Sequence, residues 1–235
     1  MSESQSPLAH ELARIRAYTR SHESLSSCHH FQFDLPLNVQ GDASNDPVEK
    51  STYVVLGINP GEIASDHRFE GPTEESSEFD FHSTLDGRDD IRWTRALRRI
   101  LPVGRVLQSQ LFFWSSNDAD ELQARLGQKL ERAKAHLEFC RDMNLKMIDV
   151  RSPDAVILAG MSKSDLAQNL YELKEMRVVP DKFRLREKGG RLVRVFSDCQ
   201  ERPWIAVPHL TSCRPPLTEN EAEMIRQIVE QSLRK

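Results

Sequence analysis

The sequence predicts an α/β fold with three layers (α/β/α), in which helices cover both faces of a central, mostly parallel, four-stranded sheet. Two observations lead to this prediction. Short apolar runs at 53–56, 155–160 and 204–208 are typical of strands that are buried on both faces. Amphipathic stretches of helical period lie between these runs. Strands that alternate with helices are joined by crossovers, and crossovers make neighbouring strands parallel.

The composition indicates one main domain without a membrane-spanning segment. The chain has 235 residues, of which 38% are hydrophobic and 29% are charged, enough for a core and a hydrated surface. No run approaches the roughly 20 apolar residues that a membrane helix needs. The polar start of the chain also lacks the apolar centre of a signal peptide. We therefore expect a cytoplasmic protein.

Charge and cysteine usage argue against several classes of function. The net charge is −4, so any contact with nucleic acid requires a local basic patch. The stretches 88–105 and 182–194 are the two candidates for such a patch. The four cysteines are scattered and form no C-x-x-C pair, which argues against a zinc ribbon or an iron–sulfur cluster. Cys28-His29-His30 lacks a second group of ligands nearby, so we expect neither a metal nor a cofactor.

The N-terminal region is expected to be an extension of the main domain. Leu8, Leu12 and Ile15 recur at helical spacing and predict a short helix. A cluster of turn-forming residues then interrupts the chain before the first apolar run. These signals divide the sequence into an N-terminal extension, residues 1–48, and a single α/β domain, residues 49–235.

The first predicted strand, 53–56, ends in the turn Gly57-Ile58-Asn59-Pro60-Gly61. In open α/β folds, ligands bind at the carboxyl edge of the sheet, where such turns lie. Pro60 has a fixed φ and pushes Asn59 toward extended backbone. Glycine on either side permits sharp bends or close approach of another backbone. We therefore expect this turn to hold the Asn59 amide rigidly at the floor of a pocket.

The middle of the chain continues the alternation of strands and helices. A long polar segment, 62–90, carries Phe69, Phe79 and Phe81, and a loop of this length in a compact domain is usually functional. The elements expected after it are a helix at 91–101, a strand at 106–114, a long helix at 120–144, a strand at 155–160 and a helix at 164–176.

The C-terminal part is expected to complete the sheet and to end in a helix. Thr218 followed by Glu221 is the signature of a capping box, which marks the start of a helix. A Gly-Gly pair at 189–190 is a turn signal between two short strands. The expected elements are hairpin strands at 183–186 and 192–196, the last core strand at 204–208 and a closing helix at 218–233.

Polar residues follow the first and the last predicted core strands. Asn59 follows the first, and His209 directly follows the last. The carboxyl ends of parallel strands lie on one edge of the sheet. We therefore expect Asn59 and His209 to face each other across one cleft, although 150 residues separate them in the sequence.

These two motifs resemble those of the uracil-DNA glycosylase superfamily. Gly57-Ile58-Asn59-Pro60-Gly61 resembles the first motif of the mismatch-specific and single-strand-selective branches at every position. The second motif, typically His-Pro-Ser, is matched in part by His209-Leu210-Thr211. The resemblance covers about residues 53–233 and keeps the motifs and landmarks in the family's order.

The resemblance implies a uracil-DNA glycosylase-like fold and a monofunctional DNA glycosylase. Such an enzyme flips a damaged base out of DNA and hydrolyses its N-glycosidic bond without a cofactor. Asn59 would orient the attacking water, and His209 would donate a hydrogen bond to the leaving base. DNA would be the partner, with no obligate protein partner. The implied contacts with the base are Gly57, Ile58, Gly61, Glu62, Phe69, Ser116 and Asn117, and those with DNA are Leu210, Thr211, Ser212 and Arg214.

Departures from the family pattern leave the substrate and the role open. Leu210 and Thr211 replace the usual proline and serine, and Glu62 follows the first motif where a small or apolar residue is common. Uracil in DNA repair and a bulkier modified base in defence against foreign DNA are both compatible with these residues. A non-catalytic module of glycosylase fold that binds nucleic acid or protein is the alternative. A serine hydrolase and a dinucleotide-binding fold are disfavoured, since G-x-S-x-G and G-x-G-x-x-G are absent.

Overall fold

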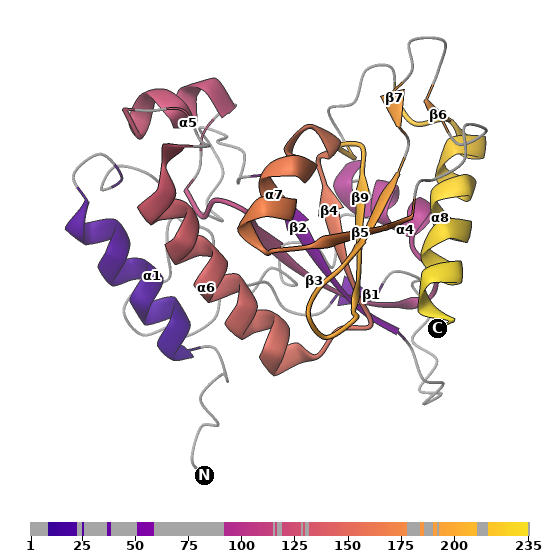
Figure 1. The fold of residues 1–235 in the computed structure, drawn as a ribbon, viewed down its shortest axis with the longest axis horizontal. Coiled ribbons are helices and arrows are strands. Elements are labelled where there is room, and N and C mark those ends of the chain that lie inside the picture. The colour runs from indigo at the N-terminus through magenta and orange to yellow at the C-terminus, as the bar shows by residue number, and fades with distance from the viewer. Residues whose placement is uncertain are drawn as a thin grey trace. The chain divides into compact units, whose positions relative to one another are not determined.

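The computed structural model describes residues 9–22, 25, 37–38, 51–58, 92–114, 116, 119–127, 129, 132–177, 184–185, 190–191, 193–210 and 216–234 (Figure 1). These residues form α1 (Ala9–Ser21), β1 (Leu37–Asn38), β2 (Ser51–Gly57), α4 (Arg92–Ile100), β3 (Gly104–Gln110), α5 (Ala119–Arg125), α6 (Lys134–Arg151), β4 (Ala155–Ala159), a 3₁₀ turn (Met161–Lys163), α7 (Ser164–Leu170), β5 (Lys174–Arg177), β6 (Arg184–Leu185), β7 (Gly190–Arg191), β8 (Arg194–Ser197), β9 (Pro203–Val207) and α8 (Glu219–Leu233).

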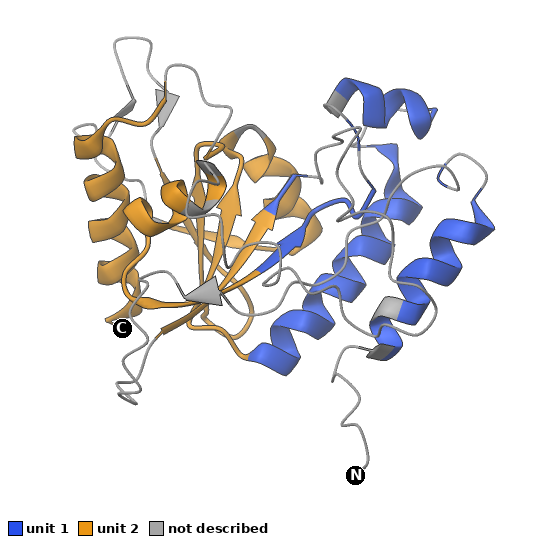
Figure 2. Cartoon of the chain, turned by 180° about the vertical axis from the view of Figure 1, so that it is seen from behind, with its two compact units in different colours: residues 1–35, 57–81, 108–151 blue, residues 36–56, 82–107, 152–235 orange. Residues whose placement is uncertain are grey.

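The chain divides into two compact units, and it passes between them several times (Figure 2). Unit 1 comprises residues 1–35, 57–81 and 108–151, and unit 2 comprises residues 36–56, 82–107 and 152–235. The short helix expected near the N-terminus is present as α1, which belongs to unit 1. The expected division of the chain at residue 48 stays a prediction.

A mixed sheet of seven strands, in the order β1-β3-β2-β4-β9-β8-β5, is centred in unit 2. β2 pairs in parallel with β4, and β4 pairs in parallel with β9, whereas β1, β8 and β5 join their neighbours antiparallel. The predicted α/β class is confirmed. The predicted number of four strands is too low, because β1, β5 and β8 extend the sheet. Two of these added strands are short edge strands, which lack the long apolar runs that revealed the central ones.

One face of this sheet is covered by α4 and α8. Side chains that alternate along β2, β4 and β9 point to this face, as strand geometry requires. They form an apolar core cluster with the buried residues of the two helices. The opposite face also carries helical structure, because Tyr171, which directly follows α7, packs on Trp204 with 4.8 Å between ring centroids. The principal members of the cluster are Tyr53, Val55, Leu97, Ile100, Ile157, Ile205, Val207, Ile225 and Val229.

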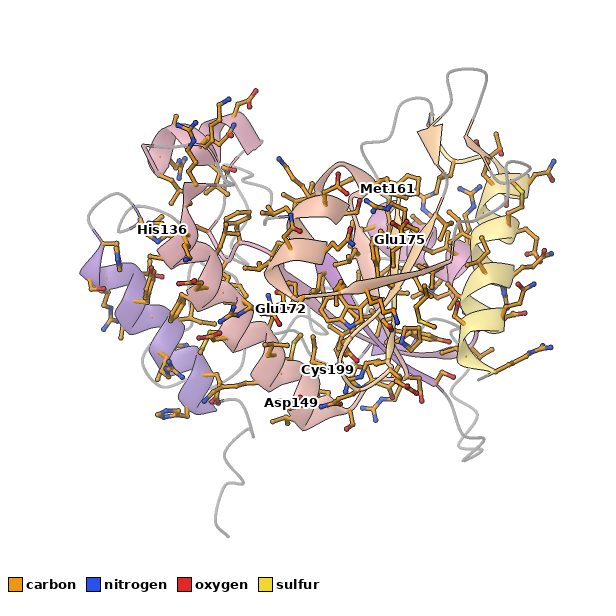
Figure 3. All side chains as sticks on the ribbon, viewed as in Figure 1. His136, Asp149, Met161, Glu172, Glu175 and Cys199 are labelled. Carbon is orange, nitrogen blue, oxygen red and sulfur yellow. The ribbon has the colours of Figure 1, made fainter. Side chains whose placement is uncertain are left out.

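The partly buried guanidinium of Arg194 on β8 joins three elements of unit 2. It donates to Ser164 Oγ at 2.9 Å and Gln168 Oε1 at 3.1 Å on α7, and it also pairs with Asp165. On β5 it binds both oxygens of Glu175, at 3.1 and 3.2 Å (Figure 3). These charge-assisted hydrogen bonds hold the edge strand β5 and α7 against β8.

Unit 1 is built around α6, whose buried face includes a polar network. Ser109 Oγ donates to Asn144 Oδ1 at 2.6 Å, and Asn144 Nδ2 donates to the Gln110 carbonyl oxygen at 2.9 Å. Asn144 is fully buried, so these bonds satisfy an amide that would otherwise be costly to bury. The network fixes the end of β3 on α6.

Aromatic side chains join α1 to α6 within unit 1. The Tyr18 ring stacks on Phe139 with 3.8 Å between centroids, and its hydroxyl lies 2.9 Å from Nδ1 of His136 (Figure 3). Trp114 Nε1 donates to Thr19 Oγ1 at 3.0 Å. Because Trp114 is fully buried, its indole supplies both apolar area and a satisfied polar group.

Two predicted helices differ from the observed ones. The helix predicted at 120–144 is interrupted, with α5 ending at Arg125 and α6 beginning at Lys134. Gly127 follows α5 with φ 64°, a left-handed conformation that ends helices. The helix predicted at 164–176 stops at Leu170, and Glu172 turns the chain into β5 with φ 54°.

Among the described helices, none is long and apolar enough to cross a membrane.

The closing helix begins as predicted. Thr218 is the N-cap of α8, and its hydroxyl accepts a hydrogen bond from the Glu221 amide at 3.2 Å. The Glu221 carboxylate in turn accepts from the Thr218 amide at 2.8 Å. These reciprocal bonds form the capping box that the sequence predicted.

Candidate functional site

The carboxyl ends of three parallel strands share one edge of the sheet in unit 2. Leu56 of β2 pairs with Leu158 of β4, and Leu158 pairs with Ala206 of β9. Just beyond this register, the Gly160 amide donates to the Val207 carbonyl oxygen at 3.0 Å. β2 and β9, whose loops carry the two sequence motifs, therefore end at the same edge, which is the edge where open α/β folds bind ligands.

His209 lies two residues beyond β9 and is half-buried. Burial lowers the pKa of its imidazole below the ordinary value of 6.5, because a low-dielectric environment disfavours the charged ring. The ring is therefore neutral at pH 7 and offers one N–H donor and one nitrogen acceptor. A neutral donor at this position can stabilise charge that develops on a bound ligand.

Trp93 lies beside His209. The two rings have centroids 5.9 Å apart and planes inclined at 60°. Trp93 belongs to the first turn of α4, and its Nε1 is buried without a hydrogen-bond partner among the described residues. Sequence analysis expected only a helix at 91–101 here, and nothing in the sequence connects Trp93 to a residue more than a hundred positions away.

In unit 1, the end of β2 is fixed by two hydrogen bonds. The Leu111 amide donates to the Gly57 carbonyl oxygen at 2.8 Å, and the Phe112 amide donates to the Ile58 carbonyl oxygen at 2.9 Å. These bonds continue the pairing of β2 with the segment after β3. The carbonyl groups of the first two residues of the motif are therefore hydrogen-bonded, whereas the expected placement of the Asn59 amide stays a prediction.

Gln110 is a polar residue of this region that sequence analysis missed. It ends β3 and is 5% exposed. A Cβ atom on Gly57 would collide with its carboxamide, lying 2.9 Å from Cδ, so any larger residue at that position would require the Gln110 side chain to shift. Its Oε1 is buried with no hydrogen-bond partner in the part of the chain that the structure describes. A signal was present in the sequence, since Gln108-Ser109-Gln110 interrupts an apolar stretch.

Eight of the predicted site residues are not placed. The described residues do not include Asn59, Gly61, Glu62, Phe69, Asn117, Thr211, Ser212 and Arg214. The expected juxtaposition of Asn59 and His209 therefore stays a prediction. Of the remaining base contacts, Ser116 is described in unit 1 and is 1% exposed.

Leu210 is poorly suited to the expected contact with DNA. It is buried and belongs to the apolar core cluster of unit 2. A side chain that fills a gap in a base stack must leave the protein interior, and withdrawing a leucine from the core costs about 2 kcal/mol or more of burial. The buried position of Leu210 therefore argues against its expected role as a DNA contact.

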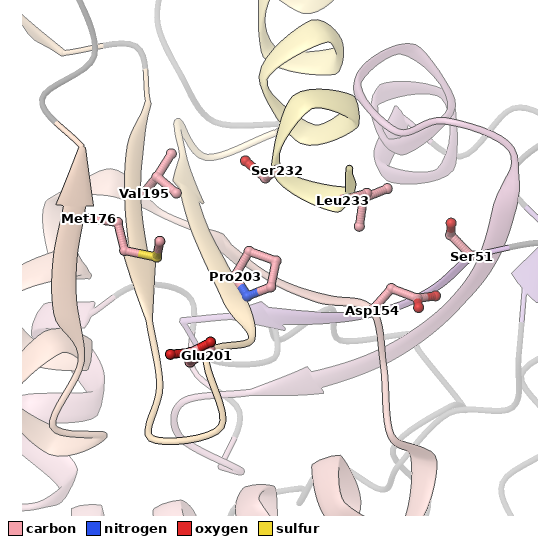
Figure 4. Close-up of a pocket in the computed structure, with 8 residues that line it drawn as sticks. All are labelled: Ser51, Asp154, Met176, Val195, Glu201, Pro203, Ser232 and Leu233. Atoms are coloured by element: carbon pink, nitrogen blue, oxygen red, sulfur yellow. The ribbon is translucent and has the colours of Figure 1, made fainter. Parts of the chain in front are cut away.

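A pocket of about 220 Å³ lies elsewhere in unit 2 (Figure 4). It opens where β2, β4 and β9 begin and where α8 ends, which is the amino edge of the sheet. None of the predicted site residues lines it. Ligands of open α/β folds bind at the other edge, so we do not assign the site to this pocket. The lining residues are Ser51, Asp154, Met176, Val195, Glu201, Pro203, Ser232 and Leu233.

The titratable groups offer little for metal or thiolate chemistry. Within the described ranges, no group of three or more His, Cys, Asp or Glu side chains is arranged to hold a metal ion. Cys140 is fully buried, and burial raises the pKa of its thiol far above its usual value. It is therefore a protonated core residue and not a nucleophile.

Comparison with protein-family models gives no match for this chain, and comparison with curated protein sequences gives none either.

Proposed function

We propose that the protein is a monofunctional DNA glycosylase. It would bind a base flipped out of DNA and hydrolyse the bond between that base and its sugar. The observation that carries this proposal is His209, a half-buried and neutral imidazole at the sheet edge where β2 also ends. The first motif follows β2 directly, and its resemblance to glycosylase motifs supplies the reaction class.

The proposed reaction requires stabilisation of charge on the departing base and a positioned water. The sugar develops oxocarbenium character in the transition state, and the departing base gains negative charge. An N–H donor of His209 directed at a carbonyl oxygen of the base would stabilise that charge, and one such donor contributes about 3–4 kcal/mol. Asn59 would position the attacking water through its amide oxygen, since a neutral amide cannot act as a strong base.

Trp93 would add an aromatic ring to the proposed site. The Trp93 ring and its buried Nε1 lie beside His209, and flipped bases are held by stacking and by hydrogen bonds to their edges. Uracil or a bulkier modified base is the proposed substrate, in DNA repair or in defence against foreign DNA.

Mass spectrometry of released bases tests the proposal. The protein is incubated with single- and double-stranded DNA that contains uracil or bulkier modified bases, and free bases and alkali-labile abasic sites are measured. We expect one free base to appear together with an equal amount of abasic sites. DNA binding without release of any base would contradict the proposal and favour a non-catalytic binding module.

A further inference from the structure

The pocket at the amino edge of the sheet, the amino-edge pocket, is built by neighbouring strands and by the end of α8 (Figure 4). Its volume of about 220 Å³ is below the ~300–1,000 Å³ of pockets that hold drug-sized ligands, so it suits a smaller organic molecule. In the sheet order β2-β4-β9-β8-β5, the residues that line it in these strands or directly before them are Ser51, Asp154, Pro203, Val195 and Met176.

Two of the lining side chains are carboxylates, and hydrogen bonds hold the backbone beneath each of them. Asp154 Oδ2 accepts from the Thr52 amide at 2.7 Å, and the Asp154 amide donates back to the Thr52 carbonyl oxygen at 2.8 Å. The Glu201 amide donates to the Asp198 carbonyl oxygen at 3.1 Å, and the next amide, of Arg202, donates to Asp198 Oδ1 at 3.0 Å. Because β4 and β9 are parallel neighbours in the sheet, the two carboxylates lie before the starts of adjacent strands.

These two negative charges are not balanced within the described part of the chain. Neither Asp154 nor Glu201 forms an ion pair with a described residue, and no basic side chain is among the described residues that line the pocket. Arg202, the neighbour of Glu201, pairs instead with Asp198 at 3.4 Å. Arg234, the C-cap of α8, is exposed and does not line the pocket. The amino-edge pocket is therefore suited to a positively charged ligand.

The end of α8 and the apolar lining residues restrict the ligand further. α8 ends at Leu233, and the last carbonyl groups of a helix carry partial negative charge and lack helical partners. The Ser232 hydroxyl donates to the Ile228 carbonyl oxygen at 2.8 Å, so its oxygen keeps lone pairs that can accept. A primary ammonium group has three N–H donors for such acceptors, and a short alkyl chain suits the apolar lining residues, which are Met176, Val195, Pro203 and Leu233.

We propose that the amino-edge pocket binds a small organic cation, a primary ammonium group on a short alkyl chain. The ammonium group would pair with the carboxylates of Asp154 and Glu201, and the chain would lie against the apolar lining residues. The same two carboxylates would repel an anion. The pocket lies at the edge of the sheet opposite to the end of β9 that carries His209, so this inference is separate from the proposed function.

Titration with n-butylamine tests the proposal, with the methyl group of Met176 as the reporter. Met176 lines the pocket and is 40% exposed. The amine is protonated at neutral pH, as a lysine side chain with its pKa of about 10.4 is. Methionine methyl groups are labelled with ¹³C for NMR, and Met176→Leu identifies the Met176 signal. We expect a saturable shift of this signal with a millimolar Kd, as suits so small a ligand.

Two ligands of the same length separate charge from apolar contact. n-Butanol lacks the positive charge and should bind about tenfold more weakly, because hydrogen bonds to charged groups are stronger than those between neutral groups. Butyrate carries the opposite charge and should give no saturable shift. Equal affinities for n-butanol and n-butylamine would overturn the proposal, as would the absence of saturable binding of n-butylamine.

Variants of the two carboxylates test the assignment of the charge. Asp154→Asn and Glu201→Gln should each raise the Kd for n-butylamine by about tenfold, because each removes one charge-assisted contact. Asparagine keeps an oxygen that can accept from the Thr52 amide, and Glu201 is exposed, so we expect both variants to fold. Glu223→Gln is the matched control, because it removes the same charge from an exposed position of α8 outside the pocket.

The control should leave the Kd unchanged, which separates a local contact from an effect of net charge. A wild-type Kd in both carboxylate variants would overturn the proposal. The titration contains no DNA, so amine binding without base release would support this pocket while the proposed reaction fails. Base release without amine binding would support the reaction while this pocket fails.

Discussion

At the scale of single residues, burial decides which protonation state His209 presents. The lowered pKa of the imidazole keeps it neutral in neutral solution, so it can donate to a base oxygen without carrying a charge of its own. We predict that His209→Ala slows base release by about 10²–10³-fold, the usual effect of removing one such donor. Single-turnover kinetics measure this, and His209→Asn, which keeps an N–H donor, should retain part of the rate. A rate unchanged by His209→Ala would remove this residue from the mechanism.

Gly57 and Gln110 form a second pair whose coupling can be measured. A Cβ on Gly57 would overlap the buried Gln110 carboxamide, so Gly57→Ala is expected to destabilise the fold by about 1–3 kcal/mol through overpacking. In a Gln110→Ala background the same substitution has room and should cost much less. Urea unfolding of the two single variants and the double variant gives the coupling energy. Additive losses would show that the carboxamide moves aside freely.

Sequence analysis identified His209 and Gly57 but missed Gln110 and Trp93. The first two follow continuous apolar strands, so their place at the carboxyl edge can be derived from strand position alone. Gln110 lies inside a stretch with the pattern of a strand, and its main-chain carbonyl accepts from Asn144 of a helix distant in the sequence. The contact between Trp93 and His209 likewise depends on tertiary packing.

At the scale of elements, the N-cap of α8 allows a clean stability test. Thr218 is exposed and bonds the Glu221 amide through its hydroxyl, so its replacement removes a cap without opening a cavity. We predict that Thr218→Ala lowers the free energy of unfolding by about 1 kcal/mol, whereas Thr218→Ser leaves it nearly unchanged. Urea unfolding checks both. Equal losses in the two variants would mean that the threonine methyl group, and not the hydroxyl, supports the helix.

Elements with a strong local signal were predicted well. The strands at 155–160 and 204–208 are continuous apolar runs, and the closing helix carries its capping box in the sequence. β5 has no such signal, because Lys174–Arg177 is polar and is held by the Arg194 bonds to Glu175. The prediction therefore extended the helix of α7 through a segment that is bound by a partner 19 residues away in the sequence.

At the scale of the whole molecule, each unit contains a histidine whose pKa is lowered by burial. These are His209 in unit 2 and His136 in unit 1. For His136 burial is the larger cause, and the neighbouring His22, with ring centroids 5.1 Å apart, adds to it. Nδ1 of His136 also faces the Tyr18 hydroxyl at 2.9 Å. Protonation of His136 would place a charge on a half-buried ring. In the tautomer in which Nδ1 accepts from the Tyr18 hydroxyl, protonation would also remove that acceptor.

The sign of the resulting pH dependence follows from linkage. A histidine with a lowered pKa in the folded state binds a proton more readily when unfolded. Its contribution to stability is therefore complete above pH 6.5, the ordinary value, and is lost as the pH falls through that value toward the folded pKa. We predict that the free energy of unfolding decreases from pH 8 to pH 5.5 and that His136→Asn and His209→Asn each flatten this decrease. Urea titrations across this range, which lies above most carboxylate pKa values, measure it. A decrease that persists undiminished in the double variant would assign the pH dependence to other groups.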